Sequence, residues 1–503
     1  MRKIMLICVV ALFTLWVGTV AAQEASNVLI MARAADTTGL DPHTQTAFAS
    51  FRLLELIYEP LVNLDENLNV IPALAESWEF SEDGMTLTLN LRQGVTFHNG
   101  AEFTAEDVVA TFNRILDEAT AAAARANYLN IASIDTPDDY TVVFNLSQPD
   151  VPLLAALATT NAAIVDSADI ESGDVATIAN GTGPFVLDNW TPEEVTTLSA
   201  NPNWWGEGPN VDGIEIRIIP DETSILAALR AGTIDFALLN DPLVATLLID
   251  DPNIILNRVP SISYNVLQLR AVVPPLDQLE VRQAISCAID RQEVLDVASL
   301  GEGQVTGPLT MATFALPPNE LFCYEKDLDR ARDLMAQAGM EDGFTLNVIA
   351  ANAEPPTALS EAQNIQAQLA EINITVEIEA LELSVYVDRW LAGDFDAAIA
   401  QNGGRPDPYT MYARYWQSTG NLNNVAGYSD ATLDDLMARG RSEIDPEARY
   451  EIFAEFQRYL AEQAPWVWLF VGYEYTAQQP YVMGFVPTPT DSLLSLAQVT
   501  LER

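Results

Sequence analysis

One short stretch of the chain carries residue types that could do chemistry. Residues 91–108 read LRQGVTFHNGAEFTAEDV and place His98, one of only two histidines, among several acidic side chains. An imidazole beside carboxylates is a composition used by metal sites and by acid–base catalysts. The neighbours that could complete such a site are Asn99, Glu102, Glu106 and Asp107.

The elements around His98 give these residues a structural role instead. Apolar and polar residues alternate through residues 85–91, which predicts a half-buried strand. A turn follows, and Thr104 then precedes Glu106 and Asp107 at the start of an apolar pattern with helical spacing. A hydroxyl at the N-cap and acids in the first turn suit the positive end of a helix. The stretch therefore predicts a strand, a turn and a capped helix.

The motifs of the common enzyme classes are absent from the sequence. There is no Gly-x-Ser-x-Gly elbow, no His-Glu-x-x-His, no paired Cys-x-x-Cys and no phosphate-binding glycine–lysine loop. Only His43 and His98 remain as candidate imidazole bases. We therefore expect a protein that is not an enzyme, with no cofactor and no bound metal ion of its own.

Charge and the first residues indicate the compartment. Residues 1–22 combine Arg2 and Lys3, an apolar run and a small-residue cleavage site, as a removable signal peptide does. The formal net charge is −47, and −49 once that segment is removed, which argues against nucleic acid as a partner. We expect an exported protein, periplasmic or otherwise extracytoplasmic and soluble after cleavage. There Cys287 and Cys323 could pair or remain free thiols.

Strand and helix patterns alternate along much of the chain. One series covers residues 214–239, and a second covers residues 345–400. Such alternation predicts an α/β protein with parallel sheets and crossover helices. Val272-Val273-Pro274-Pro275 lies between the two series and is a plausible connection between domains.

Several blocks resemble one known family over essentially the whole mature chain. In order they read LAESWEFSEDGMTLTLNLRQGVTFHNGAEFTAEDV, GTGPFVLDNW, NPNWWGEGPNVDGIEIRIIPD, LRAGTIDFALL, LEVRQAISCAIDRQEVL, ARDLMAQAGMEDGF, GRPDPY, VAGYSDATLDDLM and APWVWLF. The chain is similar to the dipeptide-, oligopeptide- and nickel-type solute-binding proteins, family 5 among the receptors of ATP-binding cassette (ABC) importers.

The resemblance implies a periplasmic-binding-protein type II fold, with two lobes joined by a hinge and an extra subdomain inserted in lobe I. Lobe II should span residues 276–476, with hinges near residues 272–276 and 475–480. His98 would then be scaffold in the extra subdomain, residues 73–179. Lobe I should be discontinuous, formed by residues 23–72, 180–275 and 477–503.

The implied function is capture of a solute between the lobes and its delivery to a membrane permease and ATPase by a monomeric receptor. A peptide or peptide-like small polar solute is the leading prediction. An oligosaccharide, an opine-like conjugate or a metal chelate remains an alternative. A sensor or scaffold module without transport is an alternative of a different class.

The segment QNGGRPDPYTMYARYW, residues 401–416, is the most informative about the ligand, because it follows a predicted strand where open α/β sheets bind ligands. Arg405 could hold a carboxylate or phosphate by two hydrogen bonds. The aromatic residues could stack on a ligand or belong to the core, and Asp407 could instead shape a turn. The predicted ligand-binding residues are His43, Tyr264, Gln268, Arg270, Gln401, Asn402, Gly403, Gly404, Arg405, Asp407 and Tyr409.

Peptide-binding relatives commonly carry an aspartate at the position of Gly404, where it holds the amino terminus of the peptide. The glycine in this sequence argues against that contact. Trp204 and Trp205 recur in the family as part of the fold, so we expect both in the core.

Overall fold

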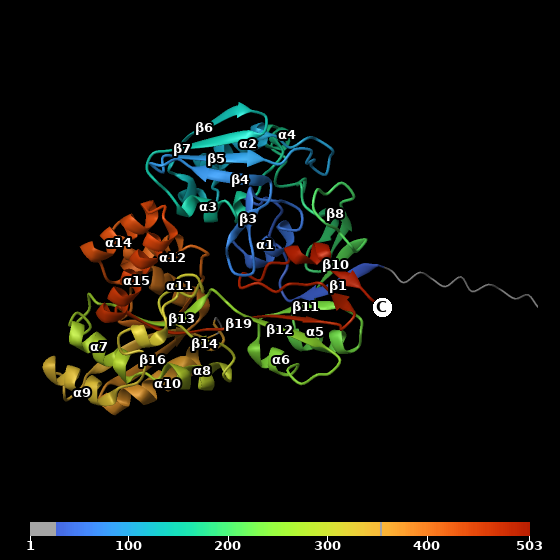
Figure 1. Cartoon of the computed structure of the whole chain (residues 1–503). Helices are drawn as coiled ribbons and strands as arrows, with labels where there is room; N and C mark the ends of the chain where they lie inside the picture. The colour runs from blue at the N-terminus through green and yellow to red at the C-terminus, as the bar shows by residue number, and fades with distance from the viewer. Residues whose placement is uncertain (1–26, 353–354) are drawn as a thin grey trace, which may run out of the picture.

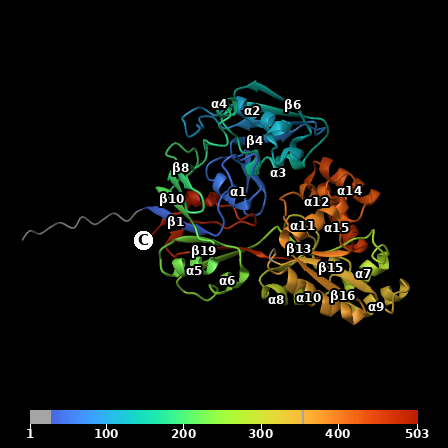
Figure 2. The same cartoon turned by 180° about the vertical axis from the view of Figure 1, so that it is seen from behind.

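The protein contains two lobes and a smaller third unit, seen from opposite sides in Figures 1 and 2. The computed structural model describes residues 27–352 and 355–503, so the predicted signal peptide at residues 1–22 lies outside the described residues. Within those residues, no helix has both the length and the apolar character needed to cross a membrane.

Lobe I is built on a seven-stranded sheet with the order β12-β19-β11-β1-β10-β9-β8. β1 (Val28–Arg33) lies inside it, parallel to β10 (Gly213–Ile218) and β11 (Phe236–Leu239). Helix α5 (Glu222–Arg230) connects those two neighbours, as the alternation predicted. The other strands are antiparallel, so the sheet is mixed rather than parallel: β8 (Phe185–Thr191), β9 (Val195–Ala200), β12 (Ile255–Pro260) and β19 (Tyr473–Gln478).

Helices cover both faces of this sheet. α5 and α6 (Pro242–Thr246) pack on one face, and α1 (Phe48–Leu54) packs on the other together with the last residues of the chain. Those last residues form a small hairpin of β20 (Val482–Met483) and β21 (Thr500–Leu501). The C-terminal segment therefore belongs to lobe I.

The extra subdomain has its own core and a four-stranded antiparallel sheet with the order β4-β5-β7-β6. Helix α2 (Ala105–Leu116) packs against this sheet, and its apolar positions are those that the helical spacing predicted. All four strands fall within residues 73–179: β4 (Ala75–Phe80), β5 (Thr86–Leu91), β6 (Ile131–Asp138) and β7 (Thr141–Leu146). Two short strands, β2 (Val62–Leu64) and β3 (Val70–Pro72), precede them.

His98 connects this subdomain to lobe I, and its contacts with the described residues are structural. Its Nε2 lies 3.0 Å from the carbonyl oxygen of Gly183, and its backbone N–H donates to the carbonyl of Gly181. The neighbouring acids cap α2, where the Thr104 N–H donates to Asp107 and the Glu106 N–H donates to the Thr104 hydroxyl. No group of metal-binding side chains occurs in the described part of the chain.

Lobe II is built on a six-stranded mixed sheet with the order β14-β18-β13-β17-β15-β16. One face carries α7 (Leu279–Ala288), α8 (Arg291–Ser299), α9 (Leu328–Gln337) and α10 (Ala358–Leu369). The other carries α11 (Leu383–Ala392), α12 (Pro408–Trp416), α14 (Ala431–Ser442) and α15 (Pro446–Gln463). The strands are β13 (Tyr264–Leu269), β14 (Gln304–Val305), β15 (Thr345–Ala351), β16 (Thr375–Leu381), β17 (Ala397–Asn402) and β18 (Trp466–Val471).

The crossings between the lobes lie elsewhere than predicted. β12 pairs in the sheet of lobe I and β13 in that of lobe II, so the first crossing is residues 261–263 and not 272–276. β18 belongs to lobe II and β19 to lobe I, so the second crossing is Gly472 and not residues 475–480. Prolines 274 and 275 lie within lobe II, after β13. By strand pairing, lobe II therefore begins near residue 263 and ends near residue 471.

Cys287 and Cys323 form a disulfide, with their Cα atoms 4.8 Å apart. The bond joins the end of α7 to the loop before α9. The sequence left this pairing open, and the structure favours the bonded form within lobe II.

Candidate ligand-binding cleft

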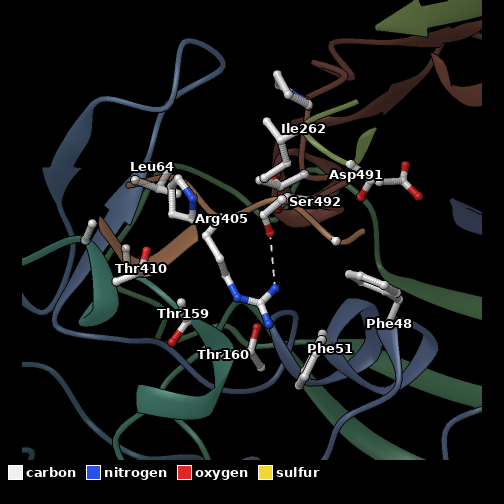
Figure 3. A pocket seen from close by; sticks show the side chains of 18 of the residues that line it. Phe48, Phe51, Leu64, Thr159, Thr160, Ile262, Arg405, Thr410, Asp491 and Ser492 are labelled. Carbon is white, nitrogen blue, oxygen red and sulfur yellow. Dashed lines mark hydrogen bonds between the residues drawn. The ribbon is translucent and has the colours of Figure 1, made fainter. Parts of the chain in front are cut away.

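A large cavity lies between the two lobes. Its volume is about 1880 Å³, above the range of roughly 300–1,000 Å³ that is typical of small-molecule sites. Residues of lobe I, the extra subdomain, lobe II and both crossings line it, and Figure 3 shows part of this lining. A site with walls from two bodies suits capture by closure, because a ligand that contacts both favours the closed form.

The predicted loop of lobe II does reach this cavity. Gln401, Gly403, Gly404, Arg405 and Tyr409 all line it. The loop follows β17, the position at which α/β sheets present ligand-binding groups.

Gly404 lets the loop lie against the first crossing. A Cβ at this position would lie 2.1 Å from the carbonyl oxygen of Ile262, whereas a Cβ at Gly403 would have only Arg405 Nη1 nearby, at 4.0 Å. A contact of 2.1 Å cannot be accommodated without moving backbone. No carboxylate side chain can therefore replace Gly404 in this geometry.

Arg405 and Arg414 present two guanidinium groups to the cavity without an acidic partner among the described residues. An Arg405 N–H donates to the carbonyl of Gly404 at 3.1 Å, and an Arg414 N–H donates to that of Gly403 at 3.0 Å. The walls of the cleft enclose Arg405, although its side chain remains accessible to the solvent inside. This enclosure, with Arg414 nearby, lowers the pKa of Arg405 from its ordinary value.

The wall of lobe I is acidic. Glu55 accepts hydrogen bonds from the Ser492 hydroxyl and the Leu493 N–H, at 2.8 and 2.6 Å. Burial raises the pKa of Glu55 and of Asp491 to about 7 each. Arg52 forms an ion pair with Asp491, and Glu474 adds a further carboxylate beside it. Three carboxylates and one arginine thus lie together on this side.

Trp204 packs against the core of lobe I and Trp205 against that of the extra subdomain, but both also line the cavity, so the prediction that they are core residues holds only in part. Their indole N–H groups donate to the two oxygens of Glu59, at 3.1 and 3.0 Å. Arg92 stacks on the Trp205 ring with its guanidinium carbon 3.9 Å from the ring centroid. Burial raises the pKa of Glu59 to about 7. The two rings are held in place and remain partly exposed.

An ion pair joins the extra subdomain to lobe II at the edge of the cavity. Arg441 donates to both oxygens of Asp150, at 3.1 and 3.0 Å, and the Val151 N–H donates to the Arg441 carbonyl. The same guanidinium lies over the Tyr409 ring at 5.1 Å. This bridge brings α14 of lobe II against the segment before α3 (Pro152–Ala156), as Figure 1 shows.

Comparison with known proteins identifies the family. The model for bacterial extracellular solute-binding proteins, family 5, matches residues 69–423. The chain belongs to this family.

Among its relatives is the glutathione-binding protein GsiB of Escherichia coli (strain K12), 28% identical, with 92% of each chain covered. Solved structures show the same fold. The periplasmic binding protein DppA from Helicobacter pylori, in complex with the peptide STSA, is 28% identical with a TM-score of 0.77, covering 95% of this chain and 98% of that one. AgaA from A. tumefaciens R10, in complex with agropinic acid, is 27% identical with a TM-score of 0.78, covering 95% and 99%.

Members of the family are solute-binding receptors rather than enzymes, and the chain is a receptor of this class. Its two-lobed α/β architecture is that of the periplasmic-binding-protein type II fold. The predicted family, fold and receptor function are confirmed.

Six of the predicted ligand-binding residues lie outside the cavity lining. His43 is fully buried, where its Nε2 lies 3.0 Å from the carbonyl oxygen of Ala163 and its Nδ1 faces Arg114. Burial lowers its pKa to about 4, so the ring is neutral at neutral pH. His43 therefore supports the packing of the extra subdomain on lobe I.

The three predicted residues on or after β13 do not line the cavity either, because this strand lies inside the sheet of lobe II. Tyr264 packs against Tyr412, with ring centroids 5.8 Å apart. Gln268 accepts from the indole of Trp390 at 2.7 Å. Arg270 lies at the far end of the strand, over the Phe395 ring.

Asn402 and Asp407 lie in the same segment as the lining residues, but their side chains point into lobe II. Asn402 is buried and accepts from the Tyr415 hydroxyl at 3.3 Å. Asp407 caps α12 by accepting from the Tyr409 N–H at 2.8 Å, and it pairs with Arg449 at 2.7 Å. Of the aromatic residues in this segment, Tyr412, Tyr415 and Trp416 are core, which leaves Tyr409 at the cavity.

Proposed function

We propose that this receptor captures a peptide or peptide-like small polar solute and delivers it to the permease of an ABC importer. The observation that carries the proposal is the large cavity between the lobes, whose walls combine charged groups, amide side chains and exposed aromatic rings. Relatives that match 92% and 95% of the chain bind glutathione and the peptide STSA, respectively. A cavity of about 1880 Å³ has room for a solute of that size.

Closure supplies the mechanism. Each lobe is built on its own sheet, and within the described residues the chain passes between the two sheets at residues 261–263 and at Gly472. A solute that contacts both walls stabilises the closed form by its differential affinity for that form. The permease can then distinguish loaded from empty receptor by shape.

An opine-like conjugate is the second candidate. The cavity has no carboxylate at Gly404, and none fits there, so a free amino terminus cannot be held at that point. The relative AgaA binds agropinic acid. A modified amino acid that carries carboxylates but no free amino terminus would suit the same walls.

Thermal-shift screening of the mature protein tests this proposal. The panel contains di- to pentapeptides, oligosaccharides, opines and metal–histidine complexes. We expect peptides, or failing them opines, to raise the melting temperature in a saturable way. A clear shift from a sugar alone would overturn the peptide assignment.

We also propose that residues 1–22 are cleaved on export and that the mature receptor is a soluble extracytoplasmic monomer. Intact mass and light scattering of the secreted protein test both points. A retained leader or a dimeric mass would contradict them.

A further inference from the structure

We infer that Arg405 and Arg414 form a carboxylate site on the wall of lobe II, which selects solutes with an anionic end and sets their orientation in the cleft. This inference rests on the proposed function, because it takes the cavity between the lobes as the solute site. It adds two specificity-determining residues and the chemical group that they bind.

The first argument is the number of unused hydrogen-bond donors. A guanidinium carries five N–H donors and readily forms paired hydrogen bonds with a carboxylate. In the structure each of these two arginines makes one hydrogen bond, to the carbonyl of Gly404 or of Gly403. Arg414 also lies over the Tyr415 ring at 4.7 Å, which fixes its position. Arg414 Nε is buried, but the remaining donors of the pair have no partner among the described residues and can bind a solute.

The second argument is the contrast with the other arginines near the cavity. Arg52 pairs with Asp491, and Arg441 pairs with Asp150. The chain has 71 acidic residues and only 24 lysines and arginines, so an arginine readily finds an acidic partner. Arg405 and Arg414 are neighbours in a cleft and have no acidic partner among the described residues. This indicates that an anion from outside the chain completes the site.

The third argument is position. Arg405 extends from the loop of lobe II into the cavity, with its guanidinium on the side of Thr160 in the extra subdomain (Figure 3). Thr159 and Thr160 both line the cavity. The Thr159 hydroxyl donates to the carbonyl of Ala156 at 2.9 Å, so the Thr160 hydroxyl is the one that can donate to the same anion. A carboxylate there would contact both bodies and stabilise the closed form.

The fourth argument is the charge of the opposite wall. Among the described residues, Glu55, Glu474 and Asp491 of lobe I face Arg52 as their counter-charge, so this wall stays net negative at neutral pH even with Glu55 and Asp491 partly protonated. An anionic group is repelled from that wall and attracted to the arginines. The cleft therefore admits a carboxylate in one orientation.

Matched peptide probes test the site by titration calorimetry. Trialanine and tetraalanine are each compared as the free acid and as the C-terminal amide. We expect the acid to bind about 10- to 100-fold more tightly than the amide, the effect of losing hydrogen bonds to a charged group. R405Q and R414Q should weaken acid binding and reduce the difference. R389Q is the control, because Arg389 pairs with Glu379 and Asp394 outside the cavity.

Chemical modification provides a readout that needs no known solute. Phenylglyoxal reacts with accessible guanidinium groups, and peptide mapping by mass spectrometry locates the adducts. We expect Arg405 to be modified early, and to be protected by trialanine, by citrate or by opine carboxylates, but not by trialanine amide.

The outcomes separate the two proposals. Acid and amide that bind equally, or acid binding unchanged in R405Q, would overturn the carboxylate site and leave a peptide receptor standing. If no peptide binds but opine carboxylates protect Arg405 and bind in an Arg405-dependent way, the site stands and the peptide assignment fails. If no carboxylate protects Arg405, the inference is wrong.

Discussion

The two walls of the cleft differ in charge and in how that charge is held. Lobe I presents carboxylates embedded in hydrogen bonds, such as Glu55 with Ser492 and Leu493. Lobe II presents arginines whose donors are mostly free. The first wall is complete without a ligand, whereas the second lacks a counter-ion. This difference suggests that lobe II binds the solute's charged end and that lobe I closes over the remainder.

The largest expected effect on stability and binding comes from a substitution at Gly404, in the loop that forms the lobe II wall. In G404A the new Cβ would meet the Ile262 carbonyl oxygen at 2.1 Å, and overpacking of this kind costs about 3 kcal/mol. We expect a markedly lower melting temperature, or loss of binding because the loop moves from the first crossing. G403A is the matched control, since its Cβ would meet only Arg405 Nη1, at 4.0 Å. Equal behaviour of the two variants would contradict this account of the loop.

The next effect concerns the bridge between the extra subdomain and lobe II. R441Q removes the paired hydrogen bonds to Asp150 and should favour the open form. We expect the dissociation constant of a bound solute to rise about tenfold, which corresponds to about 1.4 kcal/mol. R439Q on the same helix is the control, because Arg439 pairs only with surface acids. A bridge that does not assist closure would leave both variants with wild-type affinity.

The acidic wall should make stability depend on pH. The pKa of Glu55 is raised to about 7 in the folded protein, against about 4.3 in an unfolded chain. Between these values the folded protein keeps a proton that the unfolded chain releases, so the free energy of unfolding falls as pH rises from about 4 to 7.

E55Q removes this titration from the lobe I wall. The variant should lose less stability over that pH range and gain about 1 kcal/mol relative to wild type at pH 8. Thermal melts at several pH values measure the difference. A pH profile identical to that of wild type would show that Glu55 is already ionised at neutral pH.

The smallest effect should come from the stacking of Arg92 on Trp205. R92Q removes a cation–π contact with a ring-centroid distance of 3.9 Å, and we expect a loss of about 0.5–1 kcal/mol. E76Q is the comparison, because it removes only the exposed ion pair with Arg92 at 3.2 Å. If E76Q is as destabilising as R92Q, the ion pair rather than the stacking holds Arg92.

The sequence predicted elements with strong periodicity well. Strand β5, helix α2 with its cap at Thr104, and the alternation through β15, α10 and β16 all form where the patterns placed them. The prediction of parallel sheets was only partly right, because short strands such as β9 pair in antiparallel fashion with their neighbours. Residues 272–275 resemble a linker, but the actual crossing at residues 261–263 follows directly from a strand and has no comparable composition.

The candidate site was predicted in part. The loop after β17 was found because strand ends in α/β sheets present ligand-binding groups. Tyr264 and Gln268 do not reach the cavity because β13 is covered on both faces, which neither residue type reveals. The sequence did not place Trp204 and Trp205 at the cavity because aromatic residues are typical of a core. Their hydrogen bonds to Glu59 also join residues about 145 positions apart in the sequence. The acidic wall combines α1 with the last residues of the chain, a contact that no local pattern encodes.

Small-angle X-ray scattering tests the central claim most directly. The mature receptor is measured alone and after saturation with a solute taken from the thermal-shift screen. We predict that the radius of gyration falls on saturation, because the two lobes close about residues 261–263 and Gly472. Profiles that coincide with and without a solute bound at full occupancy would contradict capture by closure.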